Sequence, residues 1–253
     1  MRASPSQNKA GLQAPALFSF ITLRNESSGG ILFNPFLSLE LELDETETLI
    51  AGMFTGHYTL EAINAKCCKL FTLDKESGMR KVESTIEKLN RVNAFRFVPK
   101  KTTAPARPKQ SVSVTGSSAY FSAPKNIIWD ITYECNLKCP HCLTASGRKQ
   151  STELDTREAL LLIDKLAEAK VLTLSLTGGE PFMRKDILQL LEHLATTGIR
   201  VDIASNGFHV PHSIIKALRN LPVFQIQVSI DGIGEEHDRF RGRKNAFKPK
   251  FPG

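Results

Sequence analysis

The chain has 253 residues, of which 41% are hydrophobic and 23% are charged, a composition of folded globular proteins that excludes disordered and fibrous classes. No apolar run approaches the roughly 18 residues that span a bilayer. The apolar stretch at 14–23 is interrupted by Ser19 and Thr22 and lacks a signal-peptide cleavage site, so we predict a cytoplasmic protein without a membrane partner.

The formal net charge of +7 is unevenly distributed. Residues 100–128 and 239–253 carry eleven cations and no acid, which leaves −4 for the rest of the chain. We interpret these two segments as a solvated linker and tail, and we predict no nucleic-acid partner. A polyanion-binding role is the alternative.

Shifts in composition predict four regions. Residues 1–16 are polar, and we expect them to be disordered. Residues 17–99 carry compact strand and helix patterns, residues 100–124 form a linker rich in Thr, Ser, Pro and Lys, and residues 125–253 repeat a strand–helix pattern.

The first predicted domain combines a small sheet with three helices in a winged-helix-like α+β arrangement. Leucines alternate with polar residues over 37–43, which predicts a half-buried strand. Asp44 and Glu47 form a capping-box pattern that starts a helix. Further apolar periodicity predicts helices over 60–71 and 79–89 and a closing strand at 95–97.

Residues 29–97 resemble the PqqD-like peptide-recognition domain, on the segment Gly29–Asn34 and the pair Leu43-Asp44. The resemblance implies that an edge strand binds the leader of a precursor peptide by strand addition. A purely structural domain and a DNA-binding winged helix are the alternatives. The acids at positions 40, 42, 44, 45 and 47 count against DNA, because phosphate contacts need cations.

The second predicted domain alternates strands and helices. We expect strands at 126–133, 171–176, 200–204 and 223–230, with helices at 155–170, 186–196 and 211–218. This alternation predicts an α/β domain with a parallel sheet and a ligand site at the carboxyl ends of its strands.

Three cysteines follow the first of these strands, at Cys135, Cys139 and Cys142. Three thiolates can hold three irons of a cubane cluster and leave the fourth iron open. A zinc site with His141 is the alternative, but adjacent residues reach one tetrahedral ion only with strain. The C-x3-C-x2-C spacing resembles the radical S-adenosylmethionine (SAM) signature.

This resemblance implies a 4Fe-4S cluster and SAM as cofactors, and reductive cleavage of SAM to methionine and a 5′-deoxyadenosyl radical. It also assigns SAM contacts at the later strand ends. The implied contacts are His141 near the adenine, Gly178, Gly179 and Glu180 at the methionine amine, Ser205 and Asn206 at the ribose or carboxylate, and Ser229 and Arg241 at the carboxylate.

His141 has a plainer interpretation as a residue of a surface loop, and residues 178–180 and 205–206 have one as simple turns. Asp231 is interpreted as a turn former, His237 and Asp238 as surface residues, and Cys67 and Cys68 as inert thiols. No catalytic base or radical relay is identifiable, so the catalytic residues are unknown.

The pattern contains about four of the six strand–helix units of a complete TIM-like radical SAM barrel, and Pro249 and Pro252 interrupt a further helix. We therefore expect a truncated core that binds a cluster poorly and turns over weakly or not at all.

The leading hypothesis is a radical SAM peptide maturase of the SPASM-type branch, or its N-terminal fragment. Its expected partners are a precursor-peptide leader and an electron donor such as flavodoxin or ferredoxin. The rivals are a non-catalytic peptide-binding remnant and a radical SAM protein of the sulfatase-maturase or cofactor-biosynthesis type.

Overall fold

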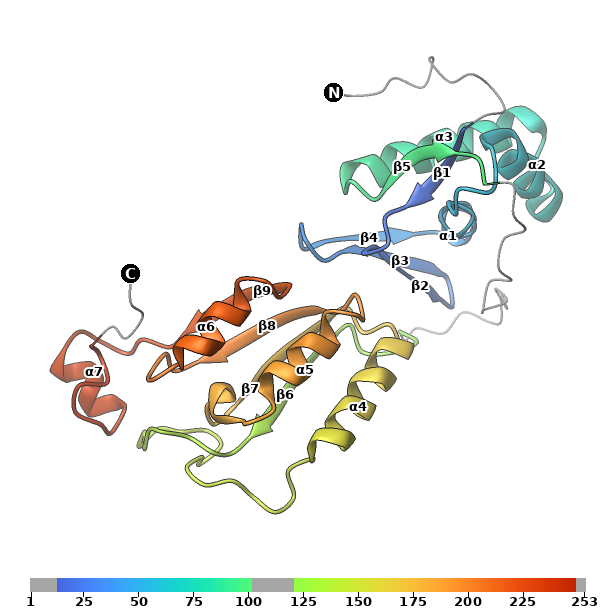
Figure 1. Cartoon of the computed structure of the whole chain (residues 1–253). Helices are drawn as coiled ribbons and strands as arrows, with labels where there is room; N and C mark the ends of the chain where they lie inside the picture. The colour runs from blue at the N-terminus through green and yellow to red at the C-terminus, as the bar shows by residue number, and fades with distance from the viewer. Residues whose placement is uncertain (1–12, 102–120, 249–253) are drawn as a thin grey trace. The chain divides into compact units, whose positions relative to one another are not determined.

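A computed structural model describes residues 13–101 and 121–248 (Figure 1). The chain divides into two compact units, residues 1–122 and 123–253. Each unit has its own hydrophobic core. No helix among the described residues is long and apolar enough to cross a membrane.

The first unit contains two small antiparallel sheets and three helices. Strand β1 (Gln13–Leu17) pairs with β5 (Phe95–Pro99), and β3 (Gly29–Asn34) lies between β2 (Thr22–Glu26) and β4 (Leu39–Leu43). The helices are α1 (Glu45–Gly52), α2 (Leu60–Phe71) and α3 (Lys75–Arg91). The predicted capping box is confirmed, because Asp44 accepts from the Glu47 amide while the Glu47 carboxylate accepts from the Asp44 amide.

The prediction that residues 1–16 are disordered is wrong for residues 13–16. These residues belong to β1, which pairs with β5 from Gln13↔Pro99 to Leu17↔Phe95. Ala14 is completely buried there. The pairing partner lies some eighty residues away in the sequence, so local polarity could not predict this strand. Residues 1–12 lie outside the described part of the chain.

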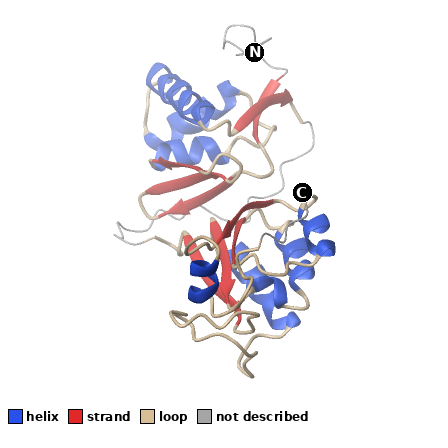
Figure 2. Cartoon of the chain, turned by 90° about the vertical axis from the view of Figure 1, so that its left-hand side faces the viewer, coloured by secondary structure: helices blue, strands red, loops and turns tan. Residues whose placement is uncertain are grey.

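The second unit is built on a four-stranded parallel sheet in the order β6-β7-β8-β9 (Figures 1 and 2). The strands are β6 (Asn126–Thr132), β7 (Thr173–Gly178), β8 (Arg200–Ser205) and β9 (Val223–Val228). The intervening helices are α4 (Thr156–Glu168), α5 (Ile187–Leu194) and α6 (His212–Leu218), with a short 3-10 turn, η2 (Pro181–Met183). This mixed α/β fold with a parallel sheet confirms the predicted class.

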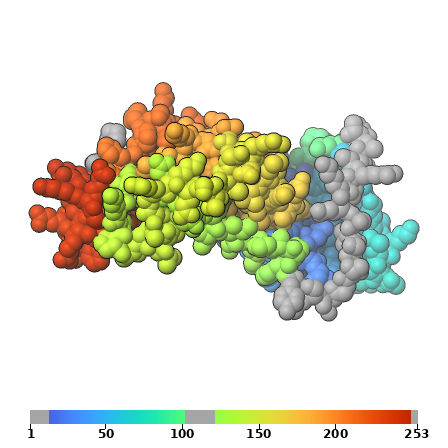
Figure 3. All heavy atoms as spheres, turned by 90° about the horizontal axis from the view of Figure 1, so that it is seen from below, coloured from blue at the N-terminus to red at the C-terminus, as the bar shows by residue number. Residues whose placement is uncertain are grey.

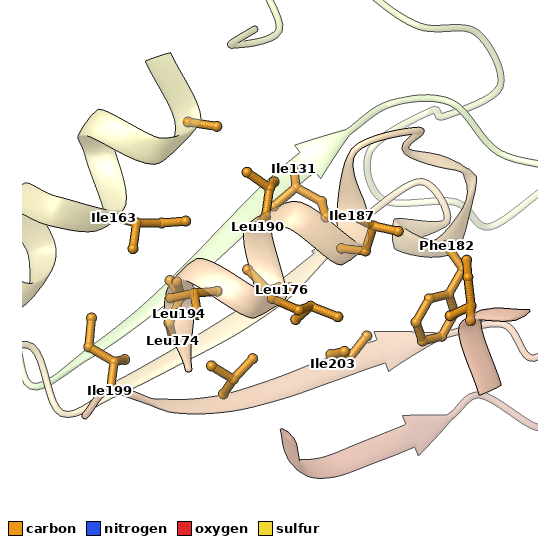
Figure 4. Close-up of a cluster of buried hydrophobic side chains, with 14 of the residues drawn as sticks. Ile131, Ile163, Leu174, Leu176, Phe182, Ile187, Leu190, Leu194, Ile199 and Ile203 are labelled. Atoms are coloured by element: carbon orange, nitrogen blue, oxygen red, sulfur yellow. The ribbon is translucent and has the colours of Figure 1, made fainter. Parts of the chain in front are cut away.

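The core of the second unit fills the space between the sheet and its helices. Figure 4 shows Leu174, Leu176 and Ile203 of the sheet facing Ile163 of α4 and Leu190 of α5, and all five side chains are buried. Alternate residues of a strand point to opposite faces of the sheet. The residues between these apolar side chains therefore point to the other face, and they are more polar.

No further strand follows β9 among the described residues, but a short helix does. Helix α7 (Glu235–Phe240) occupies a stretch for which the sequence predicted no element. The described chain then continues to residue 248 in turns.

Candidate functional site

The three clustered cysteines lie in the loop that follows β6. The base of this loop is closed by the Gly147 amide, which donates to the Tyr133 carbonyl over 2.8 Å. The Glu153 carboxylate accepts hydrogen bonds from the Tyr133 amide (2.8 Å) and the Gln150 amide (2.9 Å). These hydrogen bonds therefore hold the two ends of the loop together beside the end of β6.

All three thiols are free and partly buried, and hydrogen-bond donors face each of them. The Cys135 sulfur accepts from the Leu137 amide (3.5 Å) and from Asn206 Nδ2 (3.6 Å). The Cys142 sulfur accepts from the Ser146 amide over 3.4 Å. Burial raises the pKa of Cys135. Burial also opposes ionisation of Cys142, but hydrogen bonds from Thr144 and Ser146 lower its pKa overall.

The donor set fits an iron–sulfur cubane better than a single ion. Within residues 13–101 and 121–248, no three His, Cys, Asp or Glu side chains are grouped closely enough to hold one metal ion. A tetrahedral zinc ion needs its ligands to converge on one point. In a cubane each thiolate binds a different iron, so three free thiols in one loop are compatible with a 4Fe-4S cluster.

The two glycines after β7 are required by the backbone beside them. A Cβ on Gly178, whose φ is +117°, would lie 2.3 Å from the Thr132 carbonyl oxygen, and one on Gly179 would lie 2.2 Å from that of Glu134. Because both residues lack a Cβ, the backbones approach closely, and the amides of Gly179 and Glu180 donate to the same two carbonyls. The glycines thus join the end of β7 to the start of the cysteine loop.

Glu180 presents a carboxylate that is almost fully buried, with 1% of the residue exposed. It accepts hydrogen bonds from Ser205 Oγ (2.9 Å), the Asn206 amide (2.8 Å) and the Phe182 amide (3.2 Å). Burial nevertheless raises its pKa. No cationic side chain pairs with it in the described part of the chain. A ligand ammonium group would supply the missing positive charge.

Ser205 and Asn206 act here as supports of that carboxylate. Besides holding Glu180, Asn206 contacts Cys135 through Nδ2 and donates to Asn136 Oδ1 over 2.9 Å. Ser205 is 3% exposed. The structure therefore brings together, through one asparagine, a cysteine of the loop and the buried carboxylate of the next strand end.

Arg241 approaches the site from α7. It is buried, its Nη1 lies 3.9 Å from the Cys139 sulfur, and its carbonyl accepts from that thiol over 3.7 Å. Its Nε lies 2.8 Å from Asp231 Oδ2, at ion-pair distance but without hydrogen-bond geometry. Ser229 is held near Ser205 by its amide, which donates to the Ser205 carbonyl over 3.0 Å.

The sequence interpretation missed the structural roles of three residues near Arg241. Asp231, interpreted as a turn former, pairs with Arg241 and lies 3.4 Å from Nε2 of His141. His237, predicted to be a surface residue, is 3% exposed and its Nδ1 accepts from the Asp231 amide. Asp238 accepts from the amides of Asn245 and Phe247. These contacts span α7, so no local signal could have shown them.

Comparison with known proteins agrees with this geometry. Residues 129–250 match the model of the radical SAM superfamily. The Fe-coproporphyrin III synthase of Methanosarcina barkeri is 38% identical over 128 residues, 50% of this chain and 32% of that protein. The mycofactocin maturase MftC of Mycobacterium tuberculosis is 34% identical over 121 residues, 47% of this chain and 31% of that protein. The chain thus spans about a third of the length of these relatives.

Among solved structures, SuiB of Streptococcus suis has a similar fold. SuiB bound to its precursor peptide SuiA gives a TM-score of 0.63 at 17% identity, and SuiB bound to SAM gives 0.62 at 19%. Each match covers 92% of this chain and 52% of SuiB. The second unit holds 131 of the 253 residues, or 52%, so this coverage also includes most of the first unit.

Proposed function

We propose that the second unit, whose residues 129–250 match the model of the radical SAM superfamily, cleaves SAM to start the modification of a ribosomally made precursor peptide. The observation that carries the proposal is the position of Asn206. Its amide donates to the Glu180 carboxylate while its side chain contacts the Cys135 sulfur. A site for an ammonium group therefore adjoins a site for iron.

We assign the roles as follows. Cys135, Cys139 and Cys142 hold the 4Fe-4S cluster, which when bound supplies the electron for cleavage of SAM to methionine and a 5′-deoxyadenosyl radical. The strand end with Gly178, Gly179 and Glu180 receives the methionine amine, supported by Ser205 and Asn206. Arg241 and Ser229 bind the carboxylate, since a guanidinium matches a carboxylate as a two-pronged donor. His141 borders the adenine.

The first unit, residues 17–99 in our assignment, is proposed to recruit the peptide as a PqqD-like domain. Within the described chain, β4 is paired on only one side, with β3, and an unpaired edge can accept a peptide strand. Support comes from SuiB, whose fold covers most of this unit and whose structure includes a precursor peptide. The acids of β4 and α1 count against DNA as the ligand.

A second candidate is cofactor biosynthesis, favoured by the 38% identity to Fe-coproporphyrin III synthase. That identity extends over half of this chain, whereas the SuiB fold covers both units. We therefore place peptide modification first.

The test of SAM cleavage is direct. The protein, reconstituted anaerobically with iron and sulfide, is incubated with SAM and a small reductant, and 5′-deoxyadenosine and methionine are quantified by mass spectrometry. Because the pattern of four strand–helix units predicts weak turnover, we expect both products at a low rate and in equal amounts, and neither in a Cys139→Ala variant. Products that persist in Cys139→Ala, or their absence from a protein that holds its cluster, would contradict the assignment.

The peptide assignment is tested by selection from a displayed library of ribosomally made peptides. A SAM-dependent mass change in the bound peptide that disappears when all three site cysteines are replaced by alanine supports a maturase. Binding without any mass change favours the non-catalytic remnant, and turnover of a porphyrin instead of a peptide favours cofactor biosynthesis.

The chemistry of the proposed site also indicates the cellular compartment and the electron donor. All five cysteines are free, and a site of free thiols that needs a reductant suits a reducing compartment, so we propose a cytoplasmic location. The electron donor proposed is a flavodoxin or a ferredoxin.

A further inference from the structure

The cysteine loop is held from two sides. On one side are residues 239–248, which the sequence led us to interpret as a solvated tail. The structure corrects this interpretation, because Arg243 Nη1 donates to the Asn136 carbonyl of the loop over 2.8 Å. Figure 3 shows this red segment lying directly against the yellow-green segment that includes the loop. On the other side the loop meets the end of β7, where Arg184 lies buried without an assigned role.

Strand β6 is irregular just before it leads into the cysteine loop. Asp130 of β6 pairs with Thr177 of β7. The next pair joins Thr132 to Gly178, so Ile131 is an extra residue in β6. A β-bulge of this kind interrupts the ladder, bends the strand and re-aims the residues that follow it. The bulge therefore sets the direction in which β6 enters the loop.

The contacts between the loop and the ammonium site begin directly after this bulge. The carbonyl of Thr132 accepts from the Gly179 amide over 2.7 Å. The carbonyl of Glu134 accepts from the Glu180 amide over 2.8 Å. Both carbonyls belong to the part of β6 and its loop that the bulge redirects. The position of the Glu180 carboxylate relative to the cysteines therefore depends on how the bulge is held.

Arg184 holds the bulge with its guanidinium group. Its Nη1 donates to the carbonyl of the extra residue, Ile131, over 2.6 Å. Its Nη2 donates to the Leu154 carbonyl, beyond the far end of the loop, over 3.0 Å. The Asp186 carboxylate orients the group by accepting from Nε over 2.8 Å and from Nη2 over 3.0 Å. One planar group thus joins three segments of the unit.

A short turn, η2, connects Arg184 to Glu180. The Met183 amide donates to the Glu180 carbonyl over 2.9 Å, and the Arg184 amide donates to the Pro181 carbonyl over 3.1 Å. The proline ring fixes one of the backbone dihedral angles of this turn. A shift of the guanidinium relative to the bulge is therefore transmitted to Glu180 through a stiff segment.

We propose that Arg184 is a positioning residue, whose guanidinium holds the bulge of β6 and so fixes the Glu180 carboxylate relative to the cysteine loop. The proposal rests on the proposed function, because it concerns the same ammonium and iron sites. Arginine suits this task because its planar group donates in several fixed directions at once, whereas the lysine ammonium is a compact charge on a flexible stem. Arg184 acts through the backbone and needs no contact with SAM.

The test replaces Arg184 by lysine, which keeps a positive charge beside Asp186 but loses the planar fork. Arg200→Lys is the matched control. Arg200 forms the same kind of pair with Asp202, with Nε and Nη2 donating to the two carboxylate oxygens over 3.1 and 3.2 Å, at the amino end of β8. Asp186→Asn, which weakens the orientation of the guanidinium, decides the matter if circular dichroism shows that Arg184→Lys does not fold.

The first measurement is hydrogen–deuterium exchange in the unreconstituted chain, followed by mass spectrometry, which requires neither iron nor SAM. In Arg184→Lys we expect the amides of Gly179 and Glu180 to exchange about 10-fold faster than in the parent, because their acceptors follow the bulge. The amides of α6 and β9 should exchange as in the parent. Asp186→Asn should show the same local pattern, and Arg200→Lys should leave these two amides unchanged.

The second measurement is the SAM affinity of the reconstituted proteins by isothermal titration, normalised to their iron content. We expect Arg184→Lys to bind SAM about 10-fold more weakly, because its Glu180 carboxylate is displaced from the cysteine loop. Arg200→Lys should bind SAM as the parent does.

Parent-like exchange of the Gly179 and Glu180 amides in Arg184→Lys would overturn the proposal. So would exchange that is accelerated equally throughout the second unit, as a purely structural role predicts, or an unchanged SAM affinity in a variant with the local acceleration. If no protein, the parent included, binds iron or SAM, the proposed function is contradicted instead. Exchange of the two amides then still decides whether Arg184 holds them in place.

Discussion

At the scale of single residues, Glu180 has the most unusual environment in the site. Its carboxylate is buried, accepts three hydrogen bonds and has no cationic partner among the described side chains. Buried carboxylates are costly unless paired. An ion pair with the ammonium group of a ligand would therefore explain why the Glu180 carboxylate is buried.

We predict that Glu180→Gln weakens SAM binding about 10- to 100-fold, the range for losing a hydrogen bond to a charged group. Ser205→Ala removes one hydrogen bond from the same carboxylate but keeps its charge, so its loss should be smaller. Isothermal titration of the reconstituted proteins measures both, with iron content as the check on the cluster. Unchanged SAM affinity in Glu180→Gln would remove Glu180 from the proposed site.

At the scale of elements, the segment after α7 holds the cysteine loop through close backbone contact. Gly242 and Gly234 both have positive φ, +64° and +59°, so alanine strains the backbone at either position. Only at Gly242 would the new methyl group collide with the loop, whereas at Gly234 nothing lies within 4 Å.

Gly242→Ala should therefore displace the cysteine loop and lower the iron content after reconstitution, while Gly234→Ala should keep its iron. Overpacking of this kind costs about 1–3 kcal/mol. Iron and sulfide analysis of the two variants under identical conditions decides the matter. Equal iron content in both would mean that this contact does not hold the loop.

The start of α1 supplies a prediction about pH. Glu47 is buried, and its carboxylate lies 2.6 Å from Lys88 Nζ and accepts from the Asp44 amide over 3.0 Å. Burial opposes ionisation, but these partners lower the pKa of Glu47 below its ordinary value of 4.5. A carboxyl group with a lowered pKa stabilises the fold above its unfolded pKa, and this stabilisation is lost as pH falls through the folded pKa.

Glu47→Gln should therefore destabilise the protein by about 1–3 kcal/mol at neutral pH, and the difference should vanish at acidic pH below the pKa of Glu47. Urea unfolding followed by circular dichroism at both pH values measures it. Glu45→Gln, an exposed acid in the same first turn, is the control and should change stability by less than about 0.5 kcal/mol. A Glu47→Gln effect that is the same at both pH values would contradict the electrostatic explanation.

At the scale of the whole molecule, the sequence predicted most of the second unit because its signals are local. Apolar strands, capping residues and the spacing of Cys135, Cys139 and Cys142 can be recognised over a few positions. The polar alternation of Leu39–Leu43 and the capping box of Asp44 likewise predicted their elements.

What the sequence missed depends on contacts between distant segments. Strand β1 exists because β5 pairs with it, and Arg241 is fixed by Asp231 and Cys139 across α7. We interpreted residues 239–248 as a solvated tail because their positive charges can be read from the local sequence. Their packing on Leu137 is a contact between distant segments, which the local sequence does not show. Sequence patterns therefore predicted the residues of the proposed site, but not the contacts by which Ser205, Asn206 and Arg241 position the glutamate and the cysteines.

The central claim, that the three loop cysteines hold an iron–sulfur cluster, is tested most directly by iron and sulfide content after anaerobic reconstitution. We predict at most about four irons per chain, because the pattern of four strand–helix units predicts weak cluster binding. This iron should be lost in Cys139→Ala and retained in Cys68→Ala, which removes a free thiol of the first unit. A chain that holds no iron, or one that keeps its iron after Cys139→Ala, would contradict the claim.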